Sequence, residues 1–259
     1  MSKWFNSSSL ESRSLIGELM DDPNLDPSRH DNALAGLARL NALAGSARLV
    51  WPAVRDAARE GPVRVLDVAT GAGDVPIRLA RRARRGGRMV AWTGCDVSAR
   101  AVDHARAAAR AAGVAAEFLV LDALRDPLPE GFDVVVCSLF LHHLSEADGA
   151  ALLERMARAA RRTLLACDLE RSATGWFLAW SASRLFSASD VVRTDAVFSA
   201  RAAYTAPELK ALADRAGLTG AVVTRRWPSR LVMRWDRPGG TTNNQPSTSN
   251  KHPTTNGQP

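Results

Sequence analysis

The sequence predicts an α/β fold, with a seven-stranded, mostly parallel sheet, helices on both faces and an antiparallel last strand. Short β-branched and apolar runs alternate with segments of helical spacing between residues 61 and 168, and such alternation produces a parallel sheet. The first strand passes through two glycines directly into a helix. The last two strands are close enough in sequence to form a closing hairpin, which reverses the final one.

Composition is typical of a soluble enzyme. At 259 residues with 46% hydrophobic content, the chain can bury one large α/β core with accessory helices. No segment approaches the roughly 20 apolar residues of a membrane span, and the first residues lack the apolar stretch of a signal peptide. We therefore expect a cytoplasmic protein without a transmembrane segment.

The basic net charge of +7 raises the question of a nucleic-acid partner. The arginines are spread along the chain as a compositional bias, and neither an RNA-recognition motif nor a zinc module is present. A nucleic-acid partner is therefore not favoured. The cysteines, at Cys95, Cys137 and Cys167, show no Cys-x-x-Cys spacing. They predict inert buried thiols, with neither disulfides nor a metal site.

Residues 1–60 are expected to form a helical cap or substrate region. Residues 10–20 have an amphipathic helical pattern, and residues 28–60 form a longer helical region in which Gly45 and Pro52 indicate interruptions. Leucines at near-helical spacing predict packing on the sheet or over a ligand site. They are Leu34, Leu37, Leu40 and Leu43.

A glycine loop follows the first strand. Residues 62–68 predict a buried strand, and a helix begins at Asp74, with Pro76 early, where a missing N–H does no harm. Gly71 and Gly73 permit backbone angles and a close approach that a Cβ would block. A ligand can therefore lie against the main chain at the helix N-terminus.

The spacing in this loop separates two classes of nucleotide ligand. A dinucleotide fingerprint needs a third glycine three residues after the second, and that position, Pro76, is not glycine. An acid, Asp67, stands instead at the end of the strand, four residues before Gly71. A carboxylate there would repel a pyrophosphate but suits an ammonium group, so an NAD(P)-binding oxidoreductase is disfavoured.

A second acid supports the same interpretation. The predicted strand at 88–96 ends at Asp96, which lies 23 residues after Gly73. An acid near this distance, at the end of the next strand, can accept hydrogen bonds from both ribose hydroxyls. Ser98 then caps a helix that Gly113 ends.

Two later strands also stop at polar residues. A third strand over 117–121 is followed by Asp122, and a fourth, over 132–138, ends at Ser138. A fifth strand, over 163–168, follows a helix capped by Ser145. Open α/β sheets bind ligands at the carboxyl ends of their strands, where all these side chains are expected to meet.

The run Asp67-Val-Ala-Thr-Gly-Ala-Gly resembles the first motif of class I S-adenosylmethionine-dependent methyltransferases, Asp/Glu-x-Gly-x-Gly-x-Gly, with Ala69 in place of the first glycine. Its Asp-Val-Ala-Thr-Gly form is most similar to the ubiquinone/menaquinone-biosynthesis methyltransferase group. The resemblance covers about residues 60–236. It implies a Rossmann-like methyltransferase domain over 61–236 that uses S-adenosyl-L-methionine as cofactor, with Asp122 accepting from the adenine amino group. The implied cofactor-binding residues are Asp67, Ala69, Thr70, Gly71, Gly73, Asp96, Val97, Asp122, Ala123 and Ser138.

Two histidines are candidate catalytic bases. Methyl transfer to a phenol needs a group that removes a proton, and imidazole titrates near neutral pH. His142 and His143 follow the fourth strand, near where an acceptor should approach, although a histidine before a helix also often caps or packs. His30 is a weaker candidate, and His104 is expected on an outer surface.

Residues 169–204 interrupt the strand–helix alternation and carry Trp176, Phe177, Trp180 and Phe186. They predict either a core-packed helix or an insert that binds a flat or greasy acceptor. The expected function is methyl transfer to carbon or oxygen of a small aromatic, phenolic or quinol-like acceptor; the alternatives are an RNA or DNA methyltransferase and an NAD(P)-binding oxidoreductase.

The remaining C-terminal elements are a capped helix, a hairpin and a tail. Thr205 and Glu208 form a reciprocal capping box, and Gly217 ends the helix that follows. The closing hairpin has strands at 220–226 and 230–236. The polar residues 237–259 are expected to be disordered.

Overall fold

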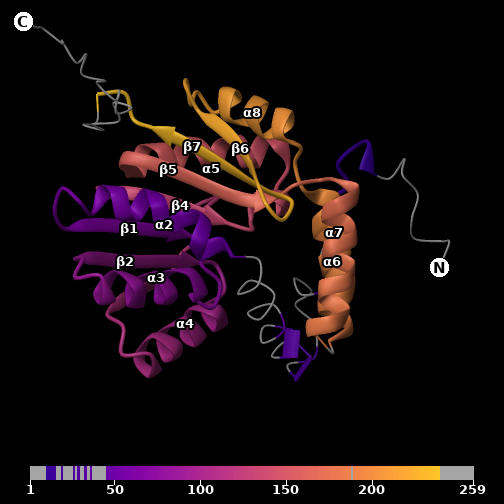
Figure 1. Cartoon of the computed structure of the whole chain (residues 1–259), viewed down its shortest axis with the longest axis horizontal. Coiled ribbons are helices and arrows are strands. Elements are labelled where there is room, and N and C mark those ends of the chain that lie inside the picture. The colour runs from indigo at the N-terminus through magenta and orange to yellow at the C-terminus, as the bar shows by residue number, and fades with distance from the viewer. Residues whose placement is uncertain are drawn as a thin grey trace, which may run out of the picture.

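The computed structural model describes residues 10–15, 19, 26, 28–29, 32–33, 36, 45–187 and 189–239. They contain a seven-stranded sheet in the order β3-β2-β1-β4-β5-β7-β6, flanked by helices (Figure 1). The strands are β1 (Val63–Val68), β2 (Val90–Asp96), β3 (Ala116–Val120), β4 (Phe132–Ser138), β5 (Ala160–Leu169), β6 (Val222–Arg226) and β7 (Arg230–Asp236). The helices are α2 (Ser46–Ala57), α3 (Asp74–Arg85), α4 (Ala99–Ala111), the 3₁₀ turn η3 (Leu141–His143), α5 (Glu146–Ala159), α6 (Ala173–Phe186), α7 (Asp190–Ala202) and α8 (Ala206–Arg215).

The sheet has the predicted topology. β1 to β5 pair in parallel, while β7 runs antiparallel between β5 and β6. The Rossmann-like, mostly parallel sheet with a closing hairpin is therefore confirmed. The strand order reverses beside β1, whose neighbours are β2 and β4. In open α/β sheets this reversal leaves space for a ligand at the carboxyl ends of the two strands that flank it.

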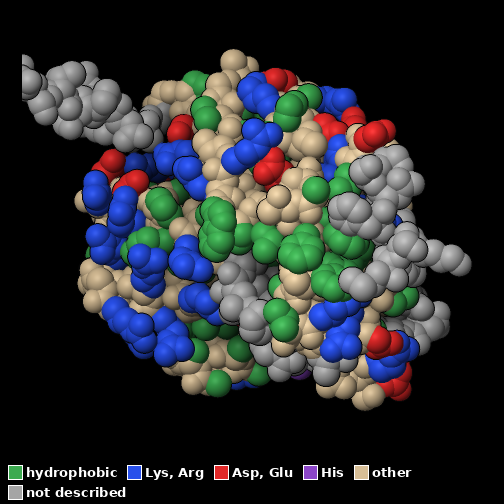
Figure 2. All heavy atoms as spheres, turned by 45° about the vertical axis from the view of Figure 1, so that its right-hand side comes forward, with side chains coloured by type: hydrophobic (Ala, Val, Ile, Leu, Met, Phe, Trp, Pro, Cys, Tyr) green, Lys and Arg blue, Asp and Glu red, His purple; other side chains and the backbone are tan. Residues whose placement is uncertain are grey.

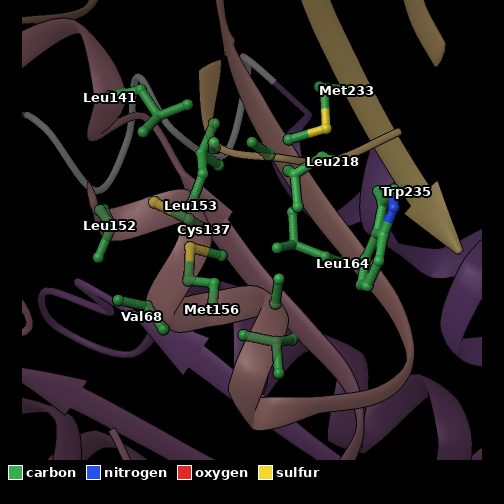
Figure 3. Packing of buried hydrophobic residues seen from close by; sticks show 14 of the residues in the cluster. Val68, Cys137, Leu141, Leu152, Leu153, Met156, Leu164, Leu218, Met233 and Trp235 are labelled. Carbon is green, nitrogen blue, oxygen red and sulfur yellow. The ribbon is translucent and has the colours of Figure 1, made fainter. Parts of the chain in front are cut away.

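Two hydrophobic cores hold helices against the two faces of the sheet. On one face, α2 and α3 pack on β1, β2 and β4, and α4 packs beside them on β3. On the other, α5 and α8 cover β4, β5 and β7. Figure 3 shows this second core, where Leu152, Leu153 and Met156 of α5 face Leu164 and Met233 of the sheet. All five side chains are fully buried, so each contributes about 1.5–3 kcal/mol of hydrophobic stabilisation.

The predicted helix caps are present. The Ser98 and Ser145 side chains accept hydrogen bonds from the first turns of α4 and α5, and Thr205 with Glu208 forms the capping box of α8. Gly113 and Gly217 end their helices with φ of +61° and +74°. Local sequence therefore determines where these helices begin and end.

The N-terminal segment departs from its predicted helix. Described residues 11–15 form a turn followed by irregular chain. The Arg13 guanidinium donates to the carbonyl oxygens of Ala202 and Leu144, and its carbon lies 3.6 Å from the centre of the Tyr204 ring. These tertiary contacts replace the helix that the amphipathic pattern predicted. The leucines Leu34, Leu37, Leu40 and Leu43, and His30, lie outside the described residues.

The helical region at 28–60 is interrupted at one of its two predicted places. Gly45 adopts φ +72° at the start of α2, as expected. Pro52 lies inside α2 without ending it. A helix-interior proline costs about 3 kcal/mol, but α2 buries Val50, Trp51 and Val54 against the sheet, and that burial exceeds the cost.

Residues 169–204 form an antiparallel helix pair, α6 and α7, which stands beyond the carboxyl ends of the parallel strands (Figure 1). Trp176 of α6 packs on Val197 and Ala200 of α7. The apolar face of α7 packs on α6 and on Ala33 rather than on the sheet.

At the C-terminal end, the Arg237 side chain still hydrogen bonds to the carbonyl oxygens of Ala157 and Ala160. Residues 240–259, most of the predicted tail, lie outside the described residues. Within the part of the chain that the structure describes, no helix combines the length and apolar character needed to cross a membrane.

Candidate functional site

The carboxyl ends of β1, β2 and β4 meet at one edge of the sheet. Register places Val68 of β1 beside both Cys95 of β2 and Cys137 of β4. The residues that follow these strands therefore gather at the point where the strand order reverses. The sequence predicted this convergence from the strand ends alone.

In the glycine loop after β1, every second residue from 69 to 73 lies in the left-handed region of backbone angles. Ala69, Gly71 and Gly73 have φ of +55°, +54° and +77°. Ala69 thus adopts the conformation that the missing first glycine of the motif would adopt without strain. A left-handed conformation costs a residue with a Cβ about 1–2 kcal/mol.

The two glycines have different roles. A Cβ on Gly71 would have no atom within 4 Å, whereas one on Gly73 would lie 2.9 Å from the Phe118 ring and 3.0 Å from Ala105. Gly71 therefore keeps the main chain open to a ligand, while Gly73 allows α3, α4 and β3 to pack together. The sequence predicted a ligand contact for both.

This difference predicts opposite outcomes for matched substitutions. Gly73→Ala should destabilise the protein by about 3 kcal/mol, because overpacking adds to the left-handed strain. Gly71→Ala should cost only about 1 kcal/mol, the strain alone. Urea unfolding of both variants tests this, and equal losses would contradict the assignment of roles.

Asp67, at the end of β1, is buried below the loop, with 2% of its surface exposed. Its Oδ2 accepts a hydrogen bond from Thr70 Oγ1 at 2.6 Å, and the Thr70 N–H donates to the carbonyl of Cys95. Burial raises the pKa of Asp67 to about 7, against the opposing hydrogen bond from Thr70. The carboxyl group can therefore gain or lose a proton near neutral pH.

The raised pKa makes stability depend on pH with a definite sign. The folded protein retains the Asp67 proton between pH 4 and 7, where the unfolded chain has lost it, so the free energy of unfolding should fall as pH rises through this window, by up to about 1.4 kcal/mol per pH unit. Asp67→Asn removes the effect. Unfolding of both proteins from pH 4 to 8 tests this, and a stability difference that is constant with pH would contradict it.

Asp96, at the end of β2, links the loop to the next helix. Its Oδ2 accepts from the Gly71 N–H at 2.8 Å, and its Oδ1 accepts from the Ser98 N–H at 2.9 Å. An ionised carboxylate has about four acceptor positions, so two remain for donors outside the chain. Val97 follows, with 66% of its surface exposed despite its apolar side chain.

The end of β3 supplies Asp122 and Ala123. Asp122 Oδ1 accepts from the Leu124 N–H at 2.9 Å, and its Oδ2 lies 3.6 Å from Arg125 Nε. Ala123 is buried. Local turn contacts therefore hold Asp122, and the register of β2 with β3 places the end of β3 beside Asp96.

The end of β4 carries an unsatisfied hydroxyl. Ser138 Oγ is buried and has no hydrogen-bond partner among the described residues, and buried polar groups usually have one. The next residue, Leu139, adopts φ +59°, which is strained for a side chain with a Cβ. An unpaired hydroxyl and a strained backbone thus occur together at the predicted site, and neither the strain nor the missing partner is visible in the sequence.

His142 forms a buried pair with Asp168, the penultimate residue of β5. His142 Nδ1 lies 2.6 Å from Asp168 Oδ1, and the His142 N–H donates to Oδ2 at 3.1 Å. Burial raises the pKa of Asp168, but the His142 charge and hydrogen bond, the Leu169 N–H and Arg230 outweigh it, and the pKa is lowered. The ionised carboxylate thus accepts a hydrogen bond from the Nδ1–H group, which leaves Nε2 as the basic nitrogen of the neutral ring.

His143 lies against His142, with ring centres 4.3 Å apart, but it differs in character. The residue keeps some exposed surface, but its ring has lost enough hydration that its pKa is lowered, chiefly by burial and also by His142. The ring is uncharged at neutral pH and is the poorer base. His104 lies exposed on α4, as predicted.

Sequence reasoning did not identify Asp168 and Arg230 as parts of the site. Arg230, at the start of β7, is 1% exposed, and its Nε donates to the Asp168 carbonyl at 3.1 Å. Asp168 lies near the end of a strand and Arg230 begins one, and these positions were the sequence signal that could have placed them at the site. Their contact depends on the antiparallel pairing of β5 with β7, which sequence spacing does not reveal.

The three cysteines are buried and free, and burial raises the pKa of each thiol. They are therefore inert, as expected for thiols in a core. Among the described residues, no group of three His, Cys, Asp or Glu side chains is placed to hold a metal ion.

Residues 65–163 match a protein family described as a methyltransferase domain. That part of the chain is therefore similar to methyltransferase domains. Demethylmenaquinone methyltransferase of Deinococcus radiodurans is 35% identical over 156 residues, which are 59% of this chain and 62% of that protein. The protein of the same name from Thermus thermophilus is 35% identical over 115 residues, 44% of this chain and 50% of the other. The chain thus matches half to about three fifths of these relatives.

The fold of this chain also occurs in solved structures. The plantazolicin methyltransferase BamL, in complex with a triazolic desmethylPZN analog and SAH (S-adenosylhomocysteine), aligns with a TM-score of 0.61 at 16% identity, covering 81% of this chain and 90% of that one. At this identity the likeness concerns the fold alone. It agrees with the sheet order and with the helices on both faces.

Proposed function

We propose that this protein transfers a methyl group from S-adenosyl-L-methionine to carbon or oxygen of a small aromatic, phenolic or quinol-like acceptor. One observation carries the proposal: the open main chain at Gly71, the Asp96 carboxylate and the unpaired Ser138 hydroxyl occur at one edge of the sheet. The relatives named as demethylmenaquinone methyltransferases and the SAH in the BamL structure support it.

The residues present fit this cofactor. Asp96 retains acceptor positions for ribose hydroxyls, and the exposed Val97 offers an apolar surface beside it for the adenine ring. Asp122 and Ala123, at the end of β3, would hold the adenine edge. Gly71 leaves room at the loop, where the ionisable Asp67 below it favours an ammonium group. Thr70, Ala69 and Gly73 maintain the loop conformation.

The cofactor supplies an electrophilic methyl group on a sulfonium that leaves readily. The protein therefore needs to orient the acceptor and, for a phenol, to remove its proton. Positioning alone can provide up to about 7–11 kcal/mol. A deprotonated phenol is nucleophilic at both its oxygen and its ring carbons, so one base serves either product.

We assign the base to His142 rather than His143. The Asp168 carboxylate holds His142 Nδ1 at 2.6 Å and would stabilise the positive charge that forms when Nε2 takes a proton. Arg230 and the Leu169 N–H keep Asp168 ionised. The low pKa of His143 makes it a poor base, although its ring lies against that of His142.

The cofactor is tested first by calorimetry with S-adenosylhomocysteine and with NAD. Binding of S-adenosylhomocysteine by the wild type, and at least tenfold weaker binding by Gly71→Val, is expected. Arg81→Ala, on the solvent side of α3, serves as the control. Binding of NAD alone, or of neither compound, would refute the proposal.

The acceptor is tested next with methyl-labelled cofactor and a panel of phenols, quinols, RNA and DNA. Label on a small aromatic product is expected, and its mass spectrum identifies the methylated atom. Label on nucleic acid alone would refute the proposed acceptor class while leaving the cofactor assignment intact.

A further inference from the structure

One face of α6 is apolar and exposed. Phe177 and Leu185 have 56% and 77% of their surfaces exposed, although the opposite face of the helix packs Trp176 on α7. The Phe177 and Trp180 rings stack, with centres 6.1 Å apart. Leaving large apolar side chains in water is unfavourable, so such a face usually meets a partner.

The turn between β6 and β7 extends this face. Trp227, at its tip, is 91% exposed, the largest value among the exposed apolar residues. The turn borders the first residues of α6, since a Cβ on Gly175 would lie 3.1 Å from Ser229 and the Glu170 N–H donates to the Ser229 carbonyl. We call Phe177, Trp180, Leu185 and Trp227 the aromatic edge.

Most of the exposed charges beside the aromatic edge are basic, and the exposed acid Asp190, at the start of α7, is paired with Arg29. Arg184 is the one charged residue of α6, and its guanidinium carbon lies 4.5 Å from the centre of the Trp180 ring. Arg225 and Arg226 directly precede Trp227, and both are exposed. The acid Glu170 is mostly buried and is paired with Arg225. Figure 2 shows hydrophobic side chains gathered across this side of the molecule, with Lys and Arg side chains and fewer Asp and Glu side chains around them.

We propose that the aromatic edge binds the surface of an anionic lipid membrane. Tryptophan and phenylalanine side chains insert at the boundary between headgroups and acyl chains, and adjacent arginines pair with lipid phosphates. A second copy of the chain would place arginines against arginines across a two-fold interface, which is unfavourable. The combination of exposed aromatic rings with mostly basic exposed charges therefore fits anionic lipid. The proposal does not depend on the methyl acceptor.

Co-sedimentation with vesicles tests the proposal without an activity measurement. Binding to vesicles of phosphatidylcholine with phosphatidylglycerol should be about a hundredfold tighter than to phosphatidylcholine alone, since each of three arginines contributes about fivefold. The double variant Phe177→Ser/Trp227→Ser should weaken binding to anionic vesicles at least tenfold. Arg184→Gln/Arg226→Gln should remove most of the preference for anionic lipid.

The matched control is Met89→Ser, which removes an apolar side chain of 68% exposure near the start of β2, at the end opposite the strand carboxyl termini. It should bind vesicles like the wild type. Circular dichroism confirms that each variant is folded. Absence of binding to anionic vesicles, equal losses in control and double variant, or a change from dimer to monomer in the double variant during gel filtration would each overturn the proposal.

Discussion

Replacing His142 with asparagine is expected to lower kcat for a phenolic acceptor by about 10²- to 10⁴-fold, the range that a positioned base contributes. The asparagine amide can still donate to Asp168, so the buried carboxylate keeps a partner and the protein remains folded. The fall of the wild-type rate at acid pH, where the base is protonated, should disappear in the variant. The measurement is kcat against pH, with the product that the labelling screen identifies.

The neighbouring histidine provides the matched control. His143→Asn should change kcat by less than tenfold, because a ring with a lowered pKa does not act as the base. Asp168→Asn should lower kcat while leaving affinity for S-adenosylhomocysteine unchanged, since it acts through His142. If His143→Asn produced the larger loss, the roles of the two histidines would be reversed.

Asp96→Ala is expected to weaken S-adenosylhomocysteine binding about a hundredfold. The substitution removes the acceptor of the Gly71 and Ser98 N–H groups, so the loop loses its fixed position. It also removes the carboxylate that would hold the ribose hydroxyls. Hydrogen bonds to a charged group contribute about 1.5–3 kcal/mol each, and two of them account for the expected change. Calorimetry measures it.

Asp103→Ala is the control for this substitution. Asp103 lies on the solvent side of α4, 73% exposed and paired with Arg106, so its loss should leave cofactor affinity unchanged. Urea unfolding shows whether Asp96→Ala is folded at the temperature of the binding measurement. A folded Asp96→Ala protein with wild-type affinity would remove Asp96 from the site.

Much of the fold follows from local patterns. The strands at 132–138 and 230–236 have the predicted bounds, because the largely apolar runs there are bounded by turn residues. The helix caps at Ser98 and Ser145 were equally predictable, since capping depends on residues within one turn. Where tertiary contacts compete with local preference, prediction failed. Arg13 holds its segment in an irregular conformation, and Pro52 remains within a helix because the sheet stabilises it.

The sequence by itself determined the mostly parallel sheet with its closing hairpin, and the acids and glycines at the strand ends, because each depends on spacing along a few consecutive residues. Only the tertiary structure decided that Gly71 is open while Gly73 packs on Phe118, that Ser138 Oγ lacks a partner, and that Asp168 holds His142. The physical reason is that these properties arise between strands distant in the chain, whose contacts are created by the register of β1, β4, β5 and β7 rather than by local preference.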